Sequence, residues 1–188
     1  MSTSSTSSVT PRIPAIDPAT TSGKAKELLD AVKGKLGMVP NMMRTMVQSP
    51  AALEGYLAFS GALGHGVLDA KAREQIALAV GQNNSCDYCV AAHSAIGKMV
   101  GLNADEITGA RSGRSADAKR TAILALASRI NETRGNVTDG DIKAARAAGV
   151  TDAELAETVA NVALNIYTNY FNHIAATQID FPKAPALA

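Results

Sequence analysis

Apolar and polar positions do not alternate cleanly in any run of β-branched residues, as they would along a half-buried strand. Glycine, proline and capping residues instead divide the chain into segments of helical length. The composition agrees with this division, because 35 of the 188 residues are alanine, the strongest helix former, and only 4% are aromatic. The pattern therefore predicts an all-α fold.

Residues that start and stop helices place the expected elements. Ser49 followed by Pro50 marks one start, and Ser85 is expected to cap a helix that begins at Cys86. Asn103 and Thr151 each precede a glutamate with the spacing of a capping box. The expected helices lie at about 21–33, 50–64, 70–81, 86–100, 116–134 and 138–149. A short Met-rich helix is expected to start at residue 41, and a helical pair is expected from 151 to 178.

The domain organisation predicted from composition is one helical domain between two tails. Residues 1–18 are rich in Ser, Thr and Pro and are expected to be a disordered tail. Residues 19–182 form the predicted all-α domain, and residues 183–188 form a C-terminal tail.

A short internal repeat suggests that this domain contains two related helical lobes. The sequence GVLDA at 66–70 recurs as GVTDA at 149–153. The lobes would cover about 19–112 and 113–182. Because the repeat is short and alanine-rich, chance is the alternative explanation.

Charge and hydropathy exclude two kinds of partner. Lys and Arg total 18 against 17 for Asp and Glu, so the net charge of +1 supplies no cation excess for a nucleic-acid backbone. No stretch approaches the roughly 18 consecutive apolar residues of a membrane helix. The Ser/Thr-rich N-terminus also lacks the apolar core of a signal peptide, so we expect a cytoplasmic protein with no membrane partner.

The two cysteines, Cys86 and Cys89, are too close in sequence to form the disulfide framework of a small secreted protein. On one helix they share a face with His93, four residues beyond Cys89. An imidazole one turn from a thiol can accept its proton, and the helix N-terminus also favours the thiolate. Glu74 is a candidate proton acceptor if the preceding helix packs beside the thiols.

These four candidates have fixed spacing, in which eleven, two and three residues separate Glu74, Cys86, Cys89 and His93. This motif resembles that of the alkylhydroperoxide reductase D-like (AhpD-like) members of the carboxymuconolactone decarboxylase family. The segments LGMVPN at 36–41 and 169–182 are similar to parts of the peroxidase-related branch. The resemblance covers roughly residues 26–182.

The resemblance implies an all-α fold, a homo-oligomer (trimer or hexamer) and thiol-dependent reduction of small organic hydroperoxides. In the family scheme Cys89 attacks the peroxide after His93 deprotonates it. Cys86 then resolves the sulfenic acid into a disulfide, with Glu74 in the proton relay. A disulfide-reducing partner protein or external dithiol restores the thiols, and no metal or bound cofactor is expected.

Two details leave the assignment of roles open. The helix dipole alone would favour Cys86 as the more reactive thiol, whereas the histidine spacing favours Cys89. Members of the family can carry a second histidine between the cysteines, where this chain has Asp87 and Tyr88. Tyr88 can donate a hydrogen bond, but its hydroxyl is a poor proton acceptor at neutral pH.

Other interpretations of the same residues are a zinc site, inert thiols, a decarboxylase or lyase acting on a small lactone acid, and a redox-sensing disulfide-exchange module. A zinc site would need a fourth ligand from His65, Glu74 or His173. His65 is expected in a loop, and His173 is expected in a packed or interface position. The methionines of the segment 38–46 are expected to fill the core or to form an apolar wall for an organic hydroperoxide.

Overall fold

The computed structural model describes residues 10–184 and 187, and within them the chain is helical and contains no strand, as predicted. The helices are α1 (Gly23–Leu36), α2 (Asn41–Met46), α3 (Pro50–Leu63), α4 (Ala70–Asn83), α5 (Asp87–Met99), α6 (Ala104–Arg111), α7 (Ala118–Thr133), α8 (Asp139–Ala147) and α9 (Asp152–Ala175). No helix in this part of the chain is both long and apolar enough to cross a membrane.

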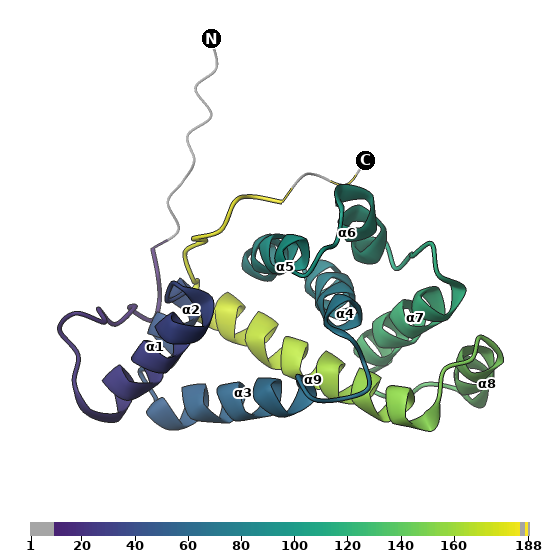
Figure 1. Ribbon diagram of the computed structural model, residues 1–188, viewed down its shortest axis with the longest axis horizontal. Helices are drawn as coiled ribbons and strands as arrows, with labels where there is room; N and C mark the ends of the chain where they lie inside the picture. Colours follow the sequence, from purple (N-terminus) through teal and green to yellow (C-terminus); the bar gives the residue numbers. More distant parts are fainter. Residues whose placement is uncertain (1–9, 185–186, 188) are drawn as a thin grey trace, which may run out of the picture.

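Helix α9 runs across the molecule and links its two ends (Figure 1). Helices α1 to α3 lie beside its C-terminal half, and α7 and α8 lie near its start. Between these groups, α4 packs against α5, α6, α7 and α9. The two helices that carry the sequence motif, α4 and α5, are therefore held in the middle of the fold.

The described residues bury two hydrophobic cores. One core is formed by α4, α6, α7, α8 and α9, with Ile76 and Leu124 fully buried in it. The other joins α1, α2 and α3 to the start of α5, with Leu29, Met46 and Leu53 at its centre, and it includes both cysteines. The cores do not divide the chain at the predicted lobe boundary near residue 112, because α4 shares its core with the later helices.

The start of α5 differs from the prediction by one residue. Cys86, and not Ser85, is the N-cap, and the helix begins at Asp87. Ser85 has a left-handed backbone with φ of 53°, so it belongs to the turn that reverses the chain after α4. The prediction was wrong because serine is the commoner cap, whereas here a cysteine sulfur takes that place.

The predicted helical pair after Thr151 is one continuous helix of 24 residues, α9. Neither glycine nor proline interrupts residues 152–175. The side chains of Asn161 and Asn165 donate to the carbonyl oxygens four residues earlier in the same helix. The helix therefore passes both residues without a turn.

The expected N-terminal tail is described only in part, because residues 1–9 lie outside the described residues. Residues 10–18 form no helix but are hydrogen-bonded to the rest of the molecule. The backbone amide of Arg12 donates to the carbonyl of Ala175 at 2.8 Å, and that of Ile16 donates to the carbonyl of Arg44 at 2.9 Å. This part of the tail is thus fixed against α2 and the end of α9.

Candidate active site

Cys86 and Cys89 are joined in a disulfide at the N-terminus of α5. The sulfur of Cys86 accepts a hydrogen bond from the backbone amide of Cys89, with the N and Sγ atoms 3.3 Å apart. The two residues are only 1% and 2% exposed. Because the pair is buried among α1 to α3, a reactant has to reach it through a cavity.

Glu74 on α4 and His93 on α5 form the second pair of the motif. The Nδ1 atom of His93 lies 2.7 Å from Oε2 of Glu74, and the side chains are 20% and 17% exposed. With a carboxylate as its partner, Nδ1 donates and the Nε2 lone pair remains free. The packing of α4 on α5 thus orients an imidazole whose free nitrogen can accept a proton.

A cavity of about 120 Å³ lies beside Cys89 and has a mainly apolar wall. His93 also lines it, whereas Cys86 does not. The wall includes Met38, Met42, Met43, Ala92, Ile96 and Phe181. Met42 and Met43 are also buried in the core, so they fill the core and line this cavity as well.

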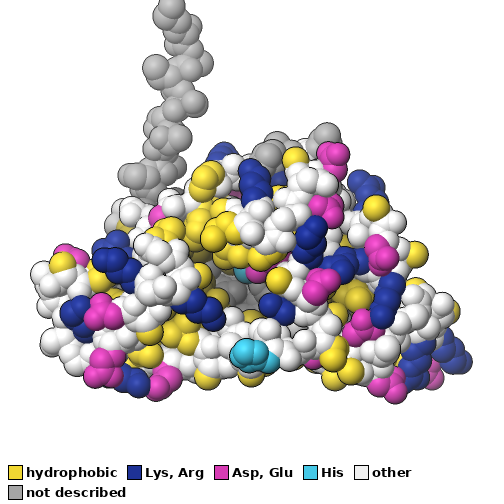
Figure 2. All heavy atoms as spheres, in the orientation of Figure 1, with side chains coloured by type: hydrophobic (Ala, Val, Ile, Leu, Met, Phe, Trp, Pro, Cys, Tyr) yellow, Lys and Arg dark blue, Asp and Glu magenta, His cyan; other side chains and the backbone are white. Residues whose placement is uncertain are grey.

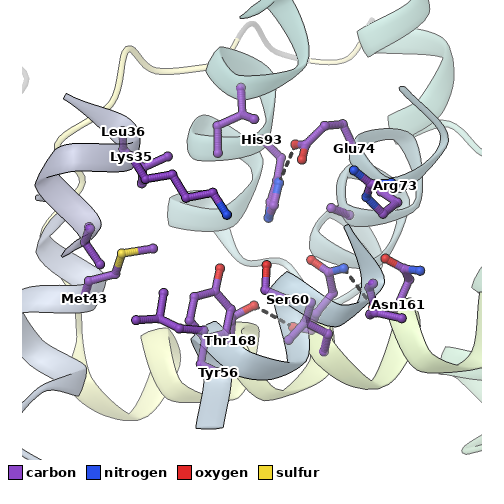
Figure 3. Close-up of a pocket in the computed structure, with 17 residues that line it drawn as sticks. Lys35, Leu36, Met43, Tyr56, Ser60, Arg73, Glu74, His93, Asn161 and Thr168 are labelled. Atoms are coloured by element: carbon purple, nitrogen blue, oxygen red, sulfur yellow. Dashed lines mark hydrogen bonds and ion pairs between the residues drawn. The ribbon is translucent and has the colours of Figure 1, made fainter. Parts of the chain in front are cut away.

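A second cavity of about 220 Å³ adjoins the first and is more polar. Glu74 and His93 line it together with Lys35, Arg73 and Tyr56, as Figure 3 shows. His93 belongs to both walls, so it is shared by the cavity that Cys89 lines and the cavity that Glu74 lines.

Tyr88, one of the two residues between the cysteines, is placed where it cannot serve as a proton acceptor. Its hydroxyl oxygen accepts a hydrogen bond from the backbone amide of Met42 at 3.1 Å, and its ring meets the edge of Phe181. Burial raises the pKa of Tyr88 far above its usual value. A neutral phenol at this position shapes the wall of the cavity and cannot accept a proton.

Tyr56 on α3 is a site residue that the sequence did not indicate. It lines both cavities. Burial, and then the charge of Glu74, raise the pKa of Tyr56 to about 12, so the hydroxyl stays protonated. Its hydroxyl can donate a hydrogen bond in the wall that it shares with His93, and no sequence motif marks it because α3 contributes this single polar residue to the shared wall.

Asn172 on α9 is a second residue that sequence reasoning missed. Its side-chain nitrogen donates to the sulfur of Cys89 at 3.3 Å, and the residue is 4% exposed. A chain of amides lies near it, since Asn84 bonds to both Asn131 and Asn169. Buried asparagines at 161, 165, 169 and 172 follow a helical spacing, and this was the available signal.

The two other histidines lie apart from the site. His65 is exposed in the turn after α3, as expected, and His173 is exposed on α9 and does not line either cavity. Among the described residues, no group of three or more His, Cys, Asp or Glu side chains is arranged to hold a metal ion. The structure therefore brings together Glu74, Cys86, Cys89 and His93, and leaves out His65 and His173.

Comparison with known proteins shows which family model the chain matches. Residues 50–132 match the model of the carboxymuconolactone decarboxylase family, a stretch that includes all four motif residues. Over 48 residues the chain is 48% identical to an uncharacterized protein of Haemophilus influenzae Rd. That match covers 25% of this chain and 42% of the Haemophilus protein, which is less than half of that relative.

Solved structures share the whole fold. An AhpD-core, peroxidase-related protein from Ralstonia eutropha JMP134 superposes with a TM-score of 0.81 at 24% identity, covering 90% of this chain and 92% of that one. A peroxidase-related protein from Silicibacter sp. TM1040 gives 0.76 at 22% identity, with 89% of each chain covered. The debrominase Bmp8 gives 0.78 at 16% identity, covering 92% and 94%.

The solved structures show that this chain has the AhpD-like fold, and the family model matches residues 50–132 of it. The resemblance seen in the sequence is thus confirmed for the fold, and the match over this part of the chain supports the family. At these identities the neighbours share an architecture, and the chemistry has to be argued from the site itself.

Proposed function

We propose that this protein is a thiol-dependent peroxidase that reduces organic hydroperoxides through Cys86 and Cys89. One observation carries the proposal: Cys89 lines an apolar cavity together with His93, whose Nδ1 is bonded to Glu74. A buried sulfur beside an oriented base and an apolar wall suits a small organic peroxide.

The reaction starts from the reduced protein. Nε2 of His93 accepts the proton of the Cys89 thiol, and the thiolate attacks the terminal oxygen of the hydroperoxide. The O–O bond breaks, and its electron pair leaves on the alkoxide, which takes the proton from His93 to become the alcohol. Cys89 is left as a sulfenic acid.

Cys86 completes the reaction. Its sulfur attacks the sulfur of Cys89, the S–O bond breaks, and the hydroxide leaves as water with the thiol proton of Cys86. The two thiols have then supplied the two electrons that reduce one hydroperoxide, so the proposal needs no bound metal or cofactor. The disulfide is the oxidised form, which an external dithiol or disulfide-reducing protein has to reduce for the next turnover.

The assignment of Cys89 as the attacking thiol follows from access. Cys89 lines the cavity, and Asn172 donates a hydrogen bond to its sulfur. Cys86 is the N-cap, so its sulfur faces the first-turn amides of α5 and is suited to resolve and later to leave as a thiolate.

The test is a single-turnover reaction. The reduced protein is mixed with one equivalent of cumene hydroperoxide, and mass spectrometry is used to follow alcohol formation and the state of Cys86 and Cys89. We expect one alcohol and one Cys86–Cys89 disulfide per chain. Cys89→Ser should form no alcohol, whereas Cys86→Ser should form one alcohol and retain a sulfenic acid that dimedone labels. Unmodified thiols in the wild type would contradict the proposal.

The same variants separate the alternatives. A decarboxylase or lyase acting on a lactone acid would keep its activity in Cys86→Ala/Cys89→Ala, because that chemistry does not need the thiols. A disulfide-exchange module would form a mixed disulfide with a partner protein and show no catalytic turnover of peroxide with any dithiol.

A further inference from the structure

The polar cavity beyond His93 contains groups that the proposed reaction does not use. Lys35 on α1 and Arg73 on α4 enter it from opposite sides, and Ser60 on α3 adds a hydroxyl (Figure 3). Lysine and arginine side chains are also visible on both sides of the hollow on this face of the molecule (Figure 2). The proposed reaction gives no role to these two cations, although they lie beside the candidate redox centre.

The charge of this cavity is not balanced by its own wall. Within residues 10–184, Lys35 has no ion-pair partner, and Arg73 donates to the backbone carbonyl of Leu68. The charge of Arg73 also acts on Asp69, and together with other groups it lowers the pKa of that carboxyl. The acidic side chain in the wall is Glu74, which is bonded to His93. The cavity therefore has an excess of positive charge that an anionic group would balance.

The two cavities, one beside the sulfur and one beside the cations, share part of their walls. Six residues line both of them: Leu36, Met43, Tyr56, His93, Ile96 and Thr168. A molecule with its reactive end beside Cys89 and its body along these shared walls would extend towards Lys35 and Arg73. The apolar half suits a hydrocarbon body, and the cationic half suits an acid group.

We propose that the preferred substrates are organic hydroperoxides that also carry a carboxylate, which binds between Lys35 and Arg73. This substrate class rests on the peroxidase function proposed above. A single negative charge fits better than a doubly charged phosphate, because Glu74 is in the same wall and would repel the second charge. Arginine and lysine on opposite sides would each donate charge-assisted hydrogen bonds to the carboxylate.

The test compares cumene hydroperoxide with its para-carboxylate, two substrates that differ only in the acid group. The measured quantity is the ratio of kcat/KM for the acid to kcat/KM for the neutral compound. We expect this ratio to fall about tenfold in Arg73→Met, where the lost charged contact is partly buried, and about threefold in Lys35→Met, because Lys35 is exposed. Lys33→Met is the matched control, because Lys33 is exposed on the same helix outside this cavity, and its ratio should not change.

A binding measurement separates this proposal from the peroxidase proposal. The alcohol derived from the acid substrate is titrated into the oxidised wild type, Lys35→Met and Lys33→Met, and its Kd is measured by calorimetry. Weaker binding only in Lys35→Met supports the carboxylate site even if neither hydroperoxide is turned over, in which case the peroxidase proposal alone fails. Turnover of both substrates with a ratio independent of Lys35 and Arg73 and a Kd independent of Lys35 overturns the carboxylate site and leaves the peroxidase proposal standing.

Discussion

The hydrogen bond between Glu74 and His93 determines which ring nitrogen can act in catalysis. Nδ1 is bonded to the carboxylate at 2.7 Å, so Nε2 is the nitrogen left to exchange a proton with a thiol or substrate. A carboxylate behind an imidazole also stabilises the imidazolium that forms when the thiol is deprotonated. Glu74 thus acts through His93, and we treat it as a positioning residue.

His93→Gln should slow the single-turnover reduction of cumene hydroperoxide by about 100-fold, because glutamine cannot accept the thiol proton. The rate is measured by stopped flow at neutral pH on the reduced protein. His173→Gln is the control, since that histidine is exposed on α9 and lines neither cavity, and its rate should equal that of the wild type. Equal rates in His93→Gln and the wild type would exclude His93 as the base.

Asn172 gives a prediction about the sulfur itself. Its amide nitrogen is 3.3 Å from Sγ of Cys89 in a buried position, where a hydrogen bond to a thiolate is stronger than one to a thiol. Asn172→Leu keeps a similar volume but removes the donor, so alkylation of reduced Cys89 by iodoacetamide at pH 7 should slow by about three- to tenfold.

Asn172→Asp should slow the alkylation further, because a carboxylate would repel the thiolate. This order, wild type faster than the leucine variant and the aspartate variant slowest, distinguishes an electrostatic role from a packing role. Peptide mapping assigns the label to Cys89. An alkylation rate that is the same in all three proteins would contradict the role of Asn172.

The N-cap of α4 is the helix cap at which we expect the clearest dependence of protein stability on pH. Asp69 is its N-cap, where it accepts from the amide of Ala72 at 2.7 Å and from Arg120 of α7 at 2.9 Å. Its hydrogen bond with Arg120 is the largest cause that lowers the pKa of Asp69 from 3.8 to about 2. Because the pKa is lower in the folded state, the stabilisation is fully present above about pH 4 and is lost as the pH falls through about 2.

Two substitutions separate the cap from the ion pair. Asp69→Asn keeps a capping oxygen and removes the charge, so at pH 7 the free energy of unfolding should fall by less than about 1 kcal/mol, as for other exposed pairs. Asp69→Ala also removes the capping oxygen, so its free energy of unfolding should fall by about 1 kcal/mol more than that of Asp69→Asn. Urea unfolding between pH 7 and pH 2 should show the wild type and Asp69→Asn converging at low pH. A difference that does not depend on pH would contradict the ion-pair interpretation.

Helix starts were the part of the fold that the sequence predicted best. The capping boxes at Asn103 and Thr151 are both formed, because a cap depends only on residues three or four positions apart. The start of α5 was missed by one residue, since a cysteine cap has no distinctive sequence pattern. The continuity of α9 was also missed, although no glycine or proline interrupts residues 152–175.

At the scale of the whole molecule, the same reasoning separates the predictable part of the site from the rest. Glu74 and His93 were found because their helices are consecutive and joined by a short turn, so spacing in sequence sets their distance. Asn172 contacts Cys89 from 83 residues away, and Lys35 comes from the first helix. No local pattern predicts which distant helices surround the cavities, because helix packing is decided by long-range burial.

The exposed side of α9 leads to a prediction about assembly. Val159, Tyr167, Tyr170 and Ile174 are 40% to 64% exposed and share one face of the helix, and residues 158–172 contain no Asp, Glu, Lys, Arg or His. Two copies can meet along such a face without like-charge repulsion, so we expect a second copy of this chain to cover it in the homo-oligomer implied by the family resemblance.

Tyr170→Glu/Ile174→Glu should shift the mass in size-exclusion light scattering towards the monomer, because each copy would bring buried charges to the interface. Met99→Glu, a change at a still more exposed apolar residue on α5, is the control and should leave the mass unchanged. An oligomer whose mass is the same in the wild type and the α9 variant would place its interface elsewhere.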